Sequence, residues 1–441
     1  MEISFAPIVK KLLLLPVGAA VWYVISRTDT IYVQVAAFAV AALVPILMMK
    51  LDVLHPWCWY SAFFFLYTVA YPILYQQGEA RFGYDKIIMI YHLIALYTLL
   101  LMVPAKSVDY REALETDGFA VSTGILNRML YLIISLLIFG GVFYISGQGF
   151  NSKVQIYRET GFLMAVIFRI PLILSVLVPL VVVDQYNRTG KLSLTGIGLG
   201  LAACGALGIL TGERDLLLRF LIVLFLLLFA LGIIKRKHFL PVGGALLAIL
   251  PLSATYKYFF LAGRVSTVKQ SKGFLYSFLT SDFSAGAQNL QVLYEHPETE
   301  GLFGYRRLLQ DIVSLFSRSE ISLTKWYNNT FFAGEKSGKG FTLAGEGWLI
   351  DGVVGIVFVF ALLGLLIRVF YRLSRKNMYF FSAYLYFIPL IIYAIRGDLA
   401  TIFSGIINQI LPIELVIYFM VMLSRRRADR ADAVQAPAGG G

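Results

Sequence analysis

Charged residues are scarce in this chain. Only 15% of its 441 residues are Asp, Glu, Lys or Arg, whereas hydrophobic residues make up 59%. An ordinary globular domain carries about 25% charged residues. The composition therefore argues against a soluble domain of average type and indicates a protein that crosses a membrane several times.

Cysteine and histidine are also rare. The two cysteines, Cys58 and Cys204, both fall within predicted membrane spans, so no disulfide framework is expected. The four histidines are scattered without HExxH or paired spacing, which argues against a zinc site. The glycine motifs of ATPases and dinucleotide-binding enzymes are absent from the sequence. We expect neither a metal nor a cofactor.

Long apolar runs occupy most of the sequence. A helix needs about 20 mostly apolar residues to cross the hydrocarbon core, and about twelve segments meet that requirement. The sequence therefore predicts an all-α polytopic membrane protein. The expected spans lie near residues 5–26, 31–49, 54–75, 86–104, 128–146, 162–183, 192–211, 216–234, 239–256, 347–370, 378–395 and 399–423.

The spans divide the chain into four predicted regions. Residues 1–256 and 347–423 form two sets of transmembrane helices, and 257–346 form a large connection that is too long to be structureless. Residues 424–441 form a basic, low-complexity tail, which we expect to be disordered and cytoplasmic.

Basic residues assign the predicted connections to two sides. If Lys10 and Lys11 are cytoplasmic, alternate connections carry most other lysines and arginines, as cytoplasmic loops do. These connections contain Lys50, Lys106, Arg111, Arg188, Lys191, KRKH 235–238, RLSRK 372–376 and RRRADR 425–430. Most of the net charge of +12 therefore reflects orientation, and we expect no nucleic-acid partner. An acidic pair with metal-ligand spacing, Glu115 and Asp117, falls on the cytoplasmic side.

Several arginines remain on the outer side, where the positive-inside rule disfavours them. They are Arg158, Arg214, Arg264, Arg306, Arg307, Arg318 and Arg396. Arginine binds phosphate oxygens through two parallel hydrogen bonds, which lysine cannot do. This set predicts a site for an anionic lipid headgroup, above all a pyrophosphate.

The long outer connection contains helical patterns. Leu308, Leu309, Ile312, Leu315 and Phe316 recur at helical spacing, opposite Gln310, Asp311, Ser314 and Arg318. They predict an amphipathic helix at the membrane interface or over the mouth of a cavity. A second helix is expected to end near His296 and Pro297, and the two together to form a lid. Arg306 and Arg307 either face solvent and headgroups or belong to the site.

Four charged segments lie at outer helix ends: YRETG 157–161, GERD 212–215, GEGWLIDGVVG 345–355 and RGD 396–398. An ionisable residue within a span is a functional candidate by default, but one at its end can also reach water. Structural alternatives remain open. Arg214 can pair with Glu213 or Asp215, Arg396 can pair with Asp398, and Glu346 can be a helix N-cap.

The order of these segments resembles the Wzy family of oligosaccharide repeat-unit polymerases, which includes the O-antigen and enterobacterial common antigen polymerases. The resemblance rests on GFNSKVQIYRETG, TGERDLLLRFLIVLFL, KGFTLAGEGWLIDGVVGIVFVFALLGLL and AIRGDLATIF. It implies a GT-C-type glycosyltransferase of the bacterial inner membrane, with its active site facing the periplasm. Such an enzyme transfers a growing glycan from undecaprenyl pyrophosphate to the non-reducing end of a new undecaprenyl-pyrophosphate-linked repeat unit. A Wzz-type chain-length regulator is the implied protein partner.

The resemblance also assigns residues. The Gly-X-Arg of the family falls on Arg214, its late arginine-glycine turn on Arg396, and its tyrosine-arginine pair on Tyr157 and Arg158. Its acid-aromatic-glycine segment falls on Glu346, Trp348 and Gly352, although many members have tyrosine or a smaller residue where this chain has Trp348.

We expect Arg214 and Arg396, supported by Arg158 and Arg264, to bind pyrophosphate and to stabilise the leaving group. Glu346 is the expected general base, with Glu213, Asp398 and His296 as alternatives. The predicted substrate-binding residues are Tyr157, Arg158, Arg264, Arg306, Arg307, Trp348 and Asp398. An O-antigen ligase, or a transporter or flippase of lipid-linked oligosaccharides, remains an alternative function.

Overall fold

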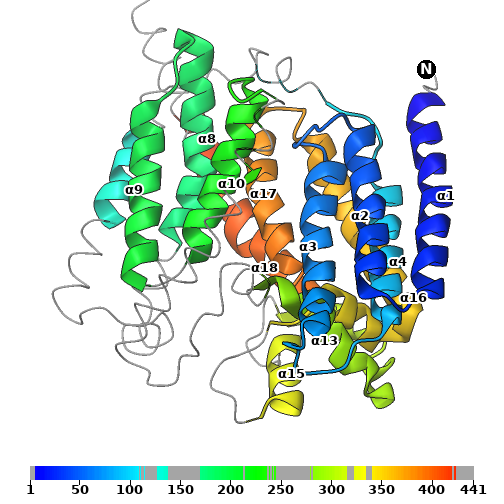
Figure 1. The fold of residues 1–441 in the computed structure, drawn as a ribbon. Coiled ribbons are helices and arrows are strands. Elements are labelled where there is room, and N and C mark those ends of the chain that lie inside the picture. Colours follow the sequence, from blue (N-terminus) through cyan, green and yellow to red (C-terminus); the bar gives the residue numbers. More distant parts are fainter. Residues whose placement is uncertain are drawn as a thin grey trace, which may run out of the picture. The chain divides into compact units, whose positions relative to one another are not determined.

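The computed structural model of the chain describes residues 5–108, 110, 114, 127–137, 169–211, 214–235, 238, 241, 243–244, 279, 282–314, 322–333, 340–419 and 422–423. Within these ranges all regular structure is helical (Figure 1). The longer helices are α1 (Phe5–Arg27), α2 (Ile31–Met48), α3 (Pro56–Gln76), α4 (Lys86–Met102), α8 (Ile170–Thr189), α9 (Leu194–Thr211), α10 (Arg214–Ala230), α16 (Leu343–Leu373) and α17 (Met378–Ala394). The shorter elements are η3 (Asp282–Ser284), α13 (Ala285–Tyr294), η4 (Pro297–Thr299), α14 (Arg306–Ser314), α15 (Leu323–Phe331), α18 (Leu399–Gly405) and the π-helical η5 (Ile406–Ile410).

The described helices confirm the predicted all-helical, many-span character. Among them six are long and apolar enough to cross a membrane: Pro7–Arg27, Ile31–Met48, Pro56–Gln76, Ile170–Thr189, Leu343–Leu373 and Leu399–Phe419. Shorter apolar helices cover Lys86–Met102, Asn127–Leu137, Leu194–Gly208 and Met378–Ala394. Most of the expected span 239–256, and the tail from 424 onward, lie outside the described residues.

The chain forms two compact units. The first comprises Met1–Val108, Lys235–Arg372 and Leu390–Gly405, and the second comprises Asp109–Ile234, Leu373–Pro389 and Ile406–Gly441. In the second unit α8, α9 and α10 pack against one another. The hydroxyl of Ser382 on α17 donates to the carbonyl oxygen of Val176 on α8 at 2.6 Å, which attaches α17 to this group.

One end of the first unit gathers basic residues. Lys11 donates to the carbonyl oxygen of Leu101 and lies close to Arg368 and Arg372 on α16. The hydroxyl of Tyr371 donates to the carbonyl oxygen of Lys106 at 3.1 Å. Lysines and arginines that the sequence assigned to one side of the membrane therefore meet at one end of this unit, which we call the basic end.

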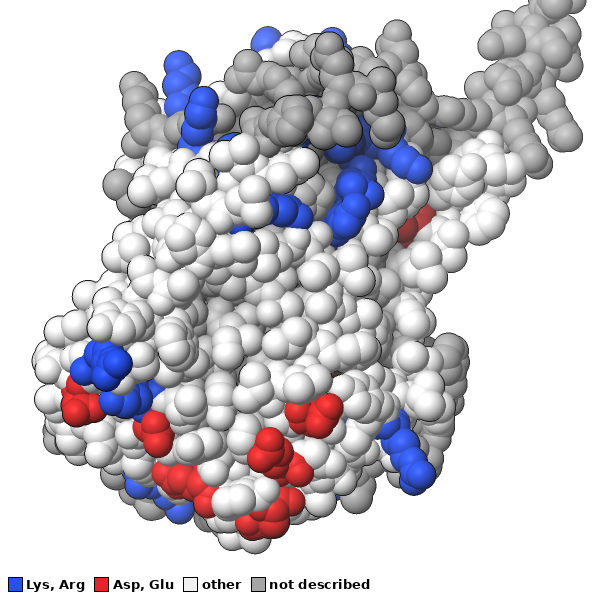
Figure 2. Space-filling view, turned by 90° about the vertical axis from the view of Figure 1, so that its right-hand side faces the viewer, with Lys and Arg blue, Asp and Glu red and all other residues white. Residues whose placement is uncertain are grey.

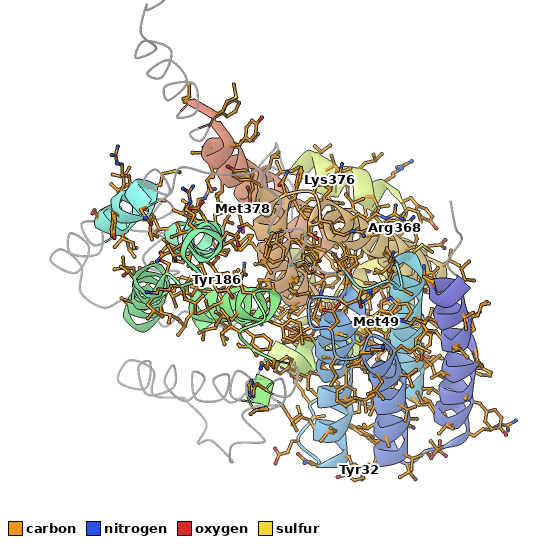
Figure 3. All side chains as sticks on the ribbon, turned by 90° about the horizontal axis from the view of Figure 1, so that it is seen from above. Tyr32, Met49, Tyr186, Arg368, Lys376 and Met378 are labelled. Atoms are coloured by element: carbon orange, nitrogen blue, oxygen red, sulfur yellow. The ribbon has the colours of Figure 1, made fainter. Side chains whose placement is uncertain are left out.

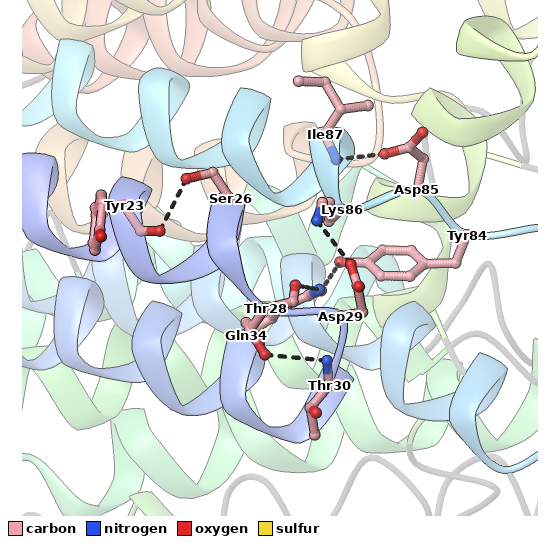
Figure 4. A network of polar contacts seen from close by, with 10 residues as sticks. All are labelled: Tyr23, Ser26, Thr28, Asp29, Thr30, Gln34, Tyr84, Asp85, Lys86 and Ile87. Atoms are coloured by element: carbon pink, nitrogen blue, oxygen red, sulfur yellow. Dashed lines mark hydrogen bonds and ion pairs between the residues drawn. The ribbon is translucent and has the colours of Figure 1, made fainter.

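At the opposite end of the first unit, polar side chains at the helix ends and in the segments between the helices contact one another (Figure 4). Lys86 pairs with Asp29 at 2.8 Å, and the hydroxyl of Tyr84 donates to Oε1 of Gln34 at 3.1 Å. The backbone N–H of Asp85 donates to Oε1 of Gln291 on α13 at 2.8 Å, which ties α13 to the start of α4. We call this the site end, because the candidate site lies there.

Side chains fill the space between the helices of the first unit. Figure 3 shows Met49, which is 2% exposed, among the packed side chains, whereas Tyr32 points away from the bundle. In Figure 2, many Lys and Arg lie toward the top, most Asp and Glu lie near the bottom together with some Lys and Arg, and the band between the two ends carries little charge. Such an uncharged band fits contact with the hydrocarbon of a bilayer.

α16 is broken into two helical pieces at Asp351 and Gly352. Gly352 has a φ of 53°, a conformation that glycine adopts without the steric cost of a Cβ. The backbone oxygen of Gly347 would lie 2.0 Å from a Cβ at Gly355, so the two pieces approach closely only because both positions are glycine. The break lets the first piece, which carries Glu346, run in a different direction from the long apolar piece.

We predict that Gly355→Ala destabilises the protein by more than the ~1–3 kcal/mol typical of overpacking, because its methyl group would overlap a backbone atom. Thermal unfolding of the protein in detergent should show a lower midpoint. Gly198→Ala on α9 is the matched control, since no atom lies within 4 Å of its Cβ position. Equal midpoints for the two variants would contradict the close packing at Gly347.

Candidate functional site

The candidate site is built around Glu346, in the first turn of α16. Its side chain is completely buried, and its Oε2 accepts a hydrogen bond of 2.7 Å from the backbone N–H of Leu399, the first residue of α18. The same two segments are also joined through their backbones, because Phe341 N–H donates to the carbonyl oxygen of Arg396 at 3.0 Å. The GEGWLID and RGD segments, which are about fifty residues apart in the chain, are therefore adjacent.

The carboxyl groups of Glu346 and Asp311 lie close enough for each to act electrostatically on the other. Both side chains are 0% exposed. Oε1 of Glu346 has no hydrogen-bond partner among the described residues. Two closely spaced buried carboxyls disfavour the state in which both are ionised.

Arg307 supplies the positive charge that faces this pair. Its Nη2 lies 2.5 Å from Oδ1 of Asp311, one helical turn further along α14, and only 5% of Arg307 is exposed. Burial raises the pKa of Asp311 above its ordinary value, while the neighbouring Glu346 carboxyl and the charge of Arg307 lower it in part. The Nε–H of Arg307 has no acceptor among the described residues.

A third acid, Asp398, lies at the start of α18. Its Oδ1 accepts from the backbone N–H of Thr401 at 2.9 Å and from the Thr401 hydroxyl at 2.6 Å, so it is the N-cap of that helix. Asp398 is 3% exposed and acts electrostatically on both Asp311 and Glu346. The partial positive charge of a helix N-terminus favours carboxylates at this position.

Arg396 is the second cation of this region. Its guanidinium carbon lies 4.6 Å from the ring centroid of Tyr393, and its side chain is half-buried. Stacking on an aromatic face fixes the position of a guanidinium.

These residues form an acid–base cluster from three elements: Asp311 and Arg307 on α14, Glu346 on α16, and Asp398 before α18. A closely spaced pair of buried carboxyls can take up or release a proton, which is the work of a general base or acid. The described residues contain no group of three or more His, Cys, Asp or Glu side chains arranged to hold a metal ion.

Several predicted site residues have structural roles. Trp348 is 4% exposed, its Nε1 donates to Oγ1 of Thr299 at 3.2 Å, and its ring packs against Tyr91 and Tyr294. It therefore belongs to the buried core of the first unit. The ring of His296, an alternative base, makes a 2.8 Å hydrogen bond with the carbonyl oxygen of Val292.

The structure separates Arg306 from Arg307. Arg306 is exposed, as expected of a residue that faces solvent or lipid headgroups, whereas Arg307 is buried against Asp311. An i,i+4 arginine–aspartate pair was readable in the sequence, but no pattern showed that this polar side of the helix faces inward.

The remaining predictions are placed only in part. Tyr157, Arg158, Glu213 and Arg264 lie outside the described residues. Arg214 begins α10, in the second unit, but its side chain also lies outside them. Its neighbour Asp215 pairs with Arg219, one turn further along, at 3.4 Å. Arg219 is therefore an ion-pair partner within α10.

Comparison of the chain with protein-family models, curated proteins and solved structures finds no match.

Removing the cation of the cluster should be costly. We predict that Arg307→Met lowers the free energy of unfolding at neutral pH by about 3–5 kcal/mol, because a buried acid loses its counter-charge. Arg306→Met, one residue earlier and exposed, should change it by less than about 0.5 kcal/mol. Chemical denaturation of both variants in the same detergent tests this, and similar losses for the two would contradict the buried pair.

Asp311 should make stability depend on pH. Folding raises the pKa of Asp311. Its contribution to the free energy of unfolding is therefore fully present below the pKa that it has in the unfolded chain, and it is lost as the pH rises through its pKa in the folded protein. Stability should therefore fall above about pH 4. In Asp311→Asn this decline should be shallower, as measured by unfolding midpoints between acid and neutral pH. The exposed Glu298→Gln is the control and should retain the wild-type slope.

Proposed function

We propose that this protein is an inner-membrane glycosyltransferase that polymerises oligosaccharide repeat units carried on undecaprenyl pyrophosphate. The observation that carries the proposal is the contact between Glu346 and the start of α18. It joins two of the four segments on which the resemblance to the Wzy polymerases rests, and it surrounds the expected base with acids.

The proposed reaction forms one glycosidic bond. A hydroxyl of the acceptor repeat unit attacks the anomeric carbon of the donor glycan, and the bond from that carbon to the pyrophosphate oxygen breaks. Undecaprenyl pyrophosphate leaves with the electron pair, and the hydroxyl proton passes to the Glu346–Asp311 pair. The pair is suited to this step because two closely spaced buried carboxylates disfavour a double negative charge and therefore favour uptake of a proton.

Arginines provide the electrostatic part of the proposal. Arg396 lies three residues before Leu399, whose N–H binds Glu346, and its guanidinium is stacked on Tyr393. Among the described side chains, Arg396 is the candidate for binding a pyrophosphate oxygen. Arg214, Arg158 and Arg264 are the further candidates. Positive charge fixed beside the departing pyrophosphate lowers the barrier most strongly, because negative charge develops there.

Orientation is part of the same proposal. The site end of the first unit would face the periplasm, since the basic end carries the residues that the positive-inside rule places in the cytoplasm. The protein would then lie in the bacterial inner membrane, and a Wzz-type regulator would meet it there.

A transporter of lipid-linked oligosaccharides is the second candidate. Two observations favour it: the helix break at Asp351 and Gly352, and the buried carboxyl pair of Glu346 and Asp311. Broken helices and buried acids also occur in proton-coupled transporters. The two candidates differ in product, because only a polymerase forms a new glycosidic bond.

We predict that Glu346→Gln reduces polymerisation by about 10²-fold or more, because an amide cannot accept the proton. The measurement is chain growth by the purified full-length protein, reconstituted with undecaprenyl-pyrophosphate-linked repeat units from the source organism. Glu298→Gln, an exposed acid, should polymerise at the wild-type rate.

The products separate the candidates. Wild-type protein that extends the lipid-linked glycan supports the polymerase, whereas glycan transferred to lipid A core identifies a ligase. Movement of the lipid-linked substrate across the vesicle without bond formation identifies a transporter. Wild-type rates in Glu346→Gln would exclude this residue as the base.

A further inference from the structure

α14 has two unlike sides, and its charged side is the buried one. Arg307 and Asp311 are 5% and 0% exposed, whereas Leu309, Ile312 and Val313 are 66%, 47% and 51% exposed. Tyr305, just before the helix, is 46% exposed. This arrangement is the reverse of that of a helix on a soluble protein, which directs its apolar side inward.

The exposed apolar residues form one stripe. At about 100° per residue, Leu309 lies roughly opposite the midpoint between Arg307 and Asp311. Ile312 and Val313 lie on either side of Leu309, and the exposed polar residues Arg306 and Gln310 form one flank of the stripe. An apolar stripe flanked by a cation is typical of a helix at a membrane surface.

The stripe continues onto a predicted membrane span. The ring of Tyr305 packs edge-on against that of Phe358 on α16, with centroids 5.4 Å apart. Around it, Val354, Val357 and Phe358 are 61%, 38% and 41% exposed. Phe358 lies about 9 Å beyond the helix break, at 1.5 Å of rise per residue. The start of α14 is therefore level with the apolar part of α16.

We propose that α14 lies in the boundary layer of the bilayer, with its apolar stripe against the lipid acyl chains and its charged side sealing the acid cluster. The occupant of this surface is lipid, because the stripe is continuous with the exposed apolar face of a helix long and apolar enough to span the membrane. A patch of this kind in water would be unfavourable by about 25 cal/mol per Å². Arg306 on its flank faces the phosphates of the headgroups.

In this placement, contact with lipid helps to position the acid cluster. Asp311 reaches Glu346 only while α14 rests against α16 and α18, and contact with the acyl chains holds it there. The inference does not depend on the proposed reaction, since it concerns where the helix lies and not what the acids do.

The test uses nitroxide spin labels on the full-length protein in phospholipid nanodiscs. Single cysteines replace Leu309 and Ile312, and Glu298→Cys, on the exposed part of η4, is the aqueous control. The native Cys58 and Cys204 are 3% and 0% exposed, and labelled wild-type protein measures their background. Power saturation compares access of oxygen, which partitions into lipid, with access of a water-soluble nickel chelate.

We expect the ratio of oxygen to nickel access to be several-fold higher at positions 309 and 312 than at 298. A ratio at 309 and 312 equal to that at 298 would place the stripe in water and overturn the proposal. Low access to both reagents would show that protein, rather than lipid, covers the stripe, and would overturn it equally. Neither result depends on whether the protein polymerises glycans.

Discussion

The burial of two neighbouring acids constrains the site end of the first unit. Neither Asp311 nor Glu346 is exposed to solvent, and an isolated charge in such a place is strongly unfavourable. The guanidinium of Arg307 faces Asp311, and the N–H of Leu399 donates to Glu346. Because these groups come from α14, α16 and α18, three segments far apart in sequence must be held together for any one of them to be tolerated.

Several features from different parts of the chain serve this arrangement. The break in α16 at Gly352 turns its first piece, with Glu346, away from the long apolar piece, and the glycines at 347 and 355 allow the two pieces to pack closely. Asp398 caps α18 and fixes where its first N–H groups point. α14 is amphipathic in the reversed sense, so that its charged side closes the cluster while its apolar side remains outside.

Burial of these acids is unfavourable in free energy. A buried acid in a membrane-spanning helical protein is by default a candidate for a functional residue. A buried acid beside a second buried acid suits transfer of a hydroxyl proton as well as it suits coupled transport. The products that the protein forms distinguish between these two chemistries. The stability of the acid cluster and the lipid contact of α14 can be measured without identifying those products.

The sequence by itself determined the helical class and the long apolar helices, and it predicted the sidedness of the basic residues and a site at Glu346, Arg396 and Asp398. These follow from local properties: apolar run length, charge distribution and helix-end chemistry. Only the tertiary structure decided that Glu346 meets Asp311 and Leu399, that Arg307 is buried beside an exposed Arg306, and that Trp348 is core. Spacing defines which residues share a helix face, but which face meets protein and which meets lipid depends on partners that lie far along the chain.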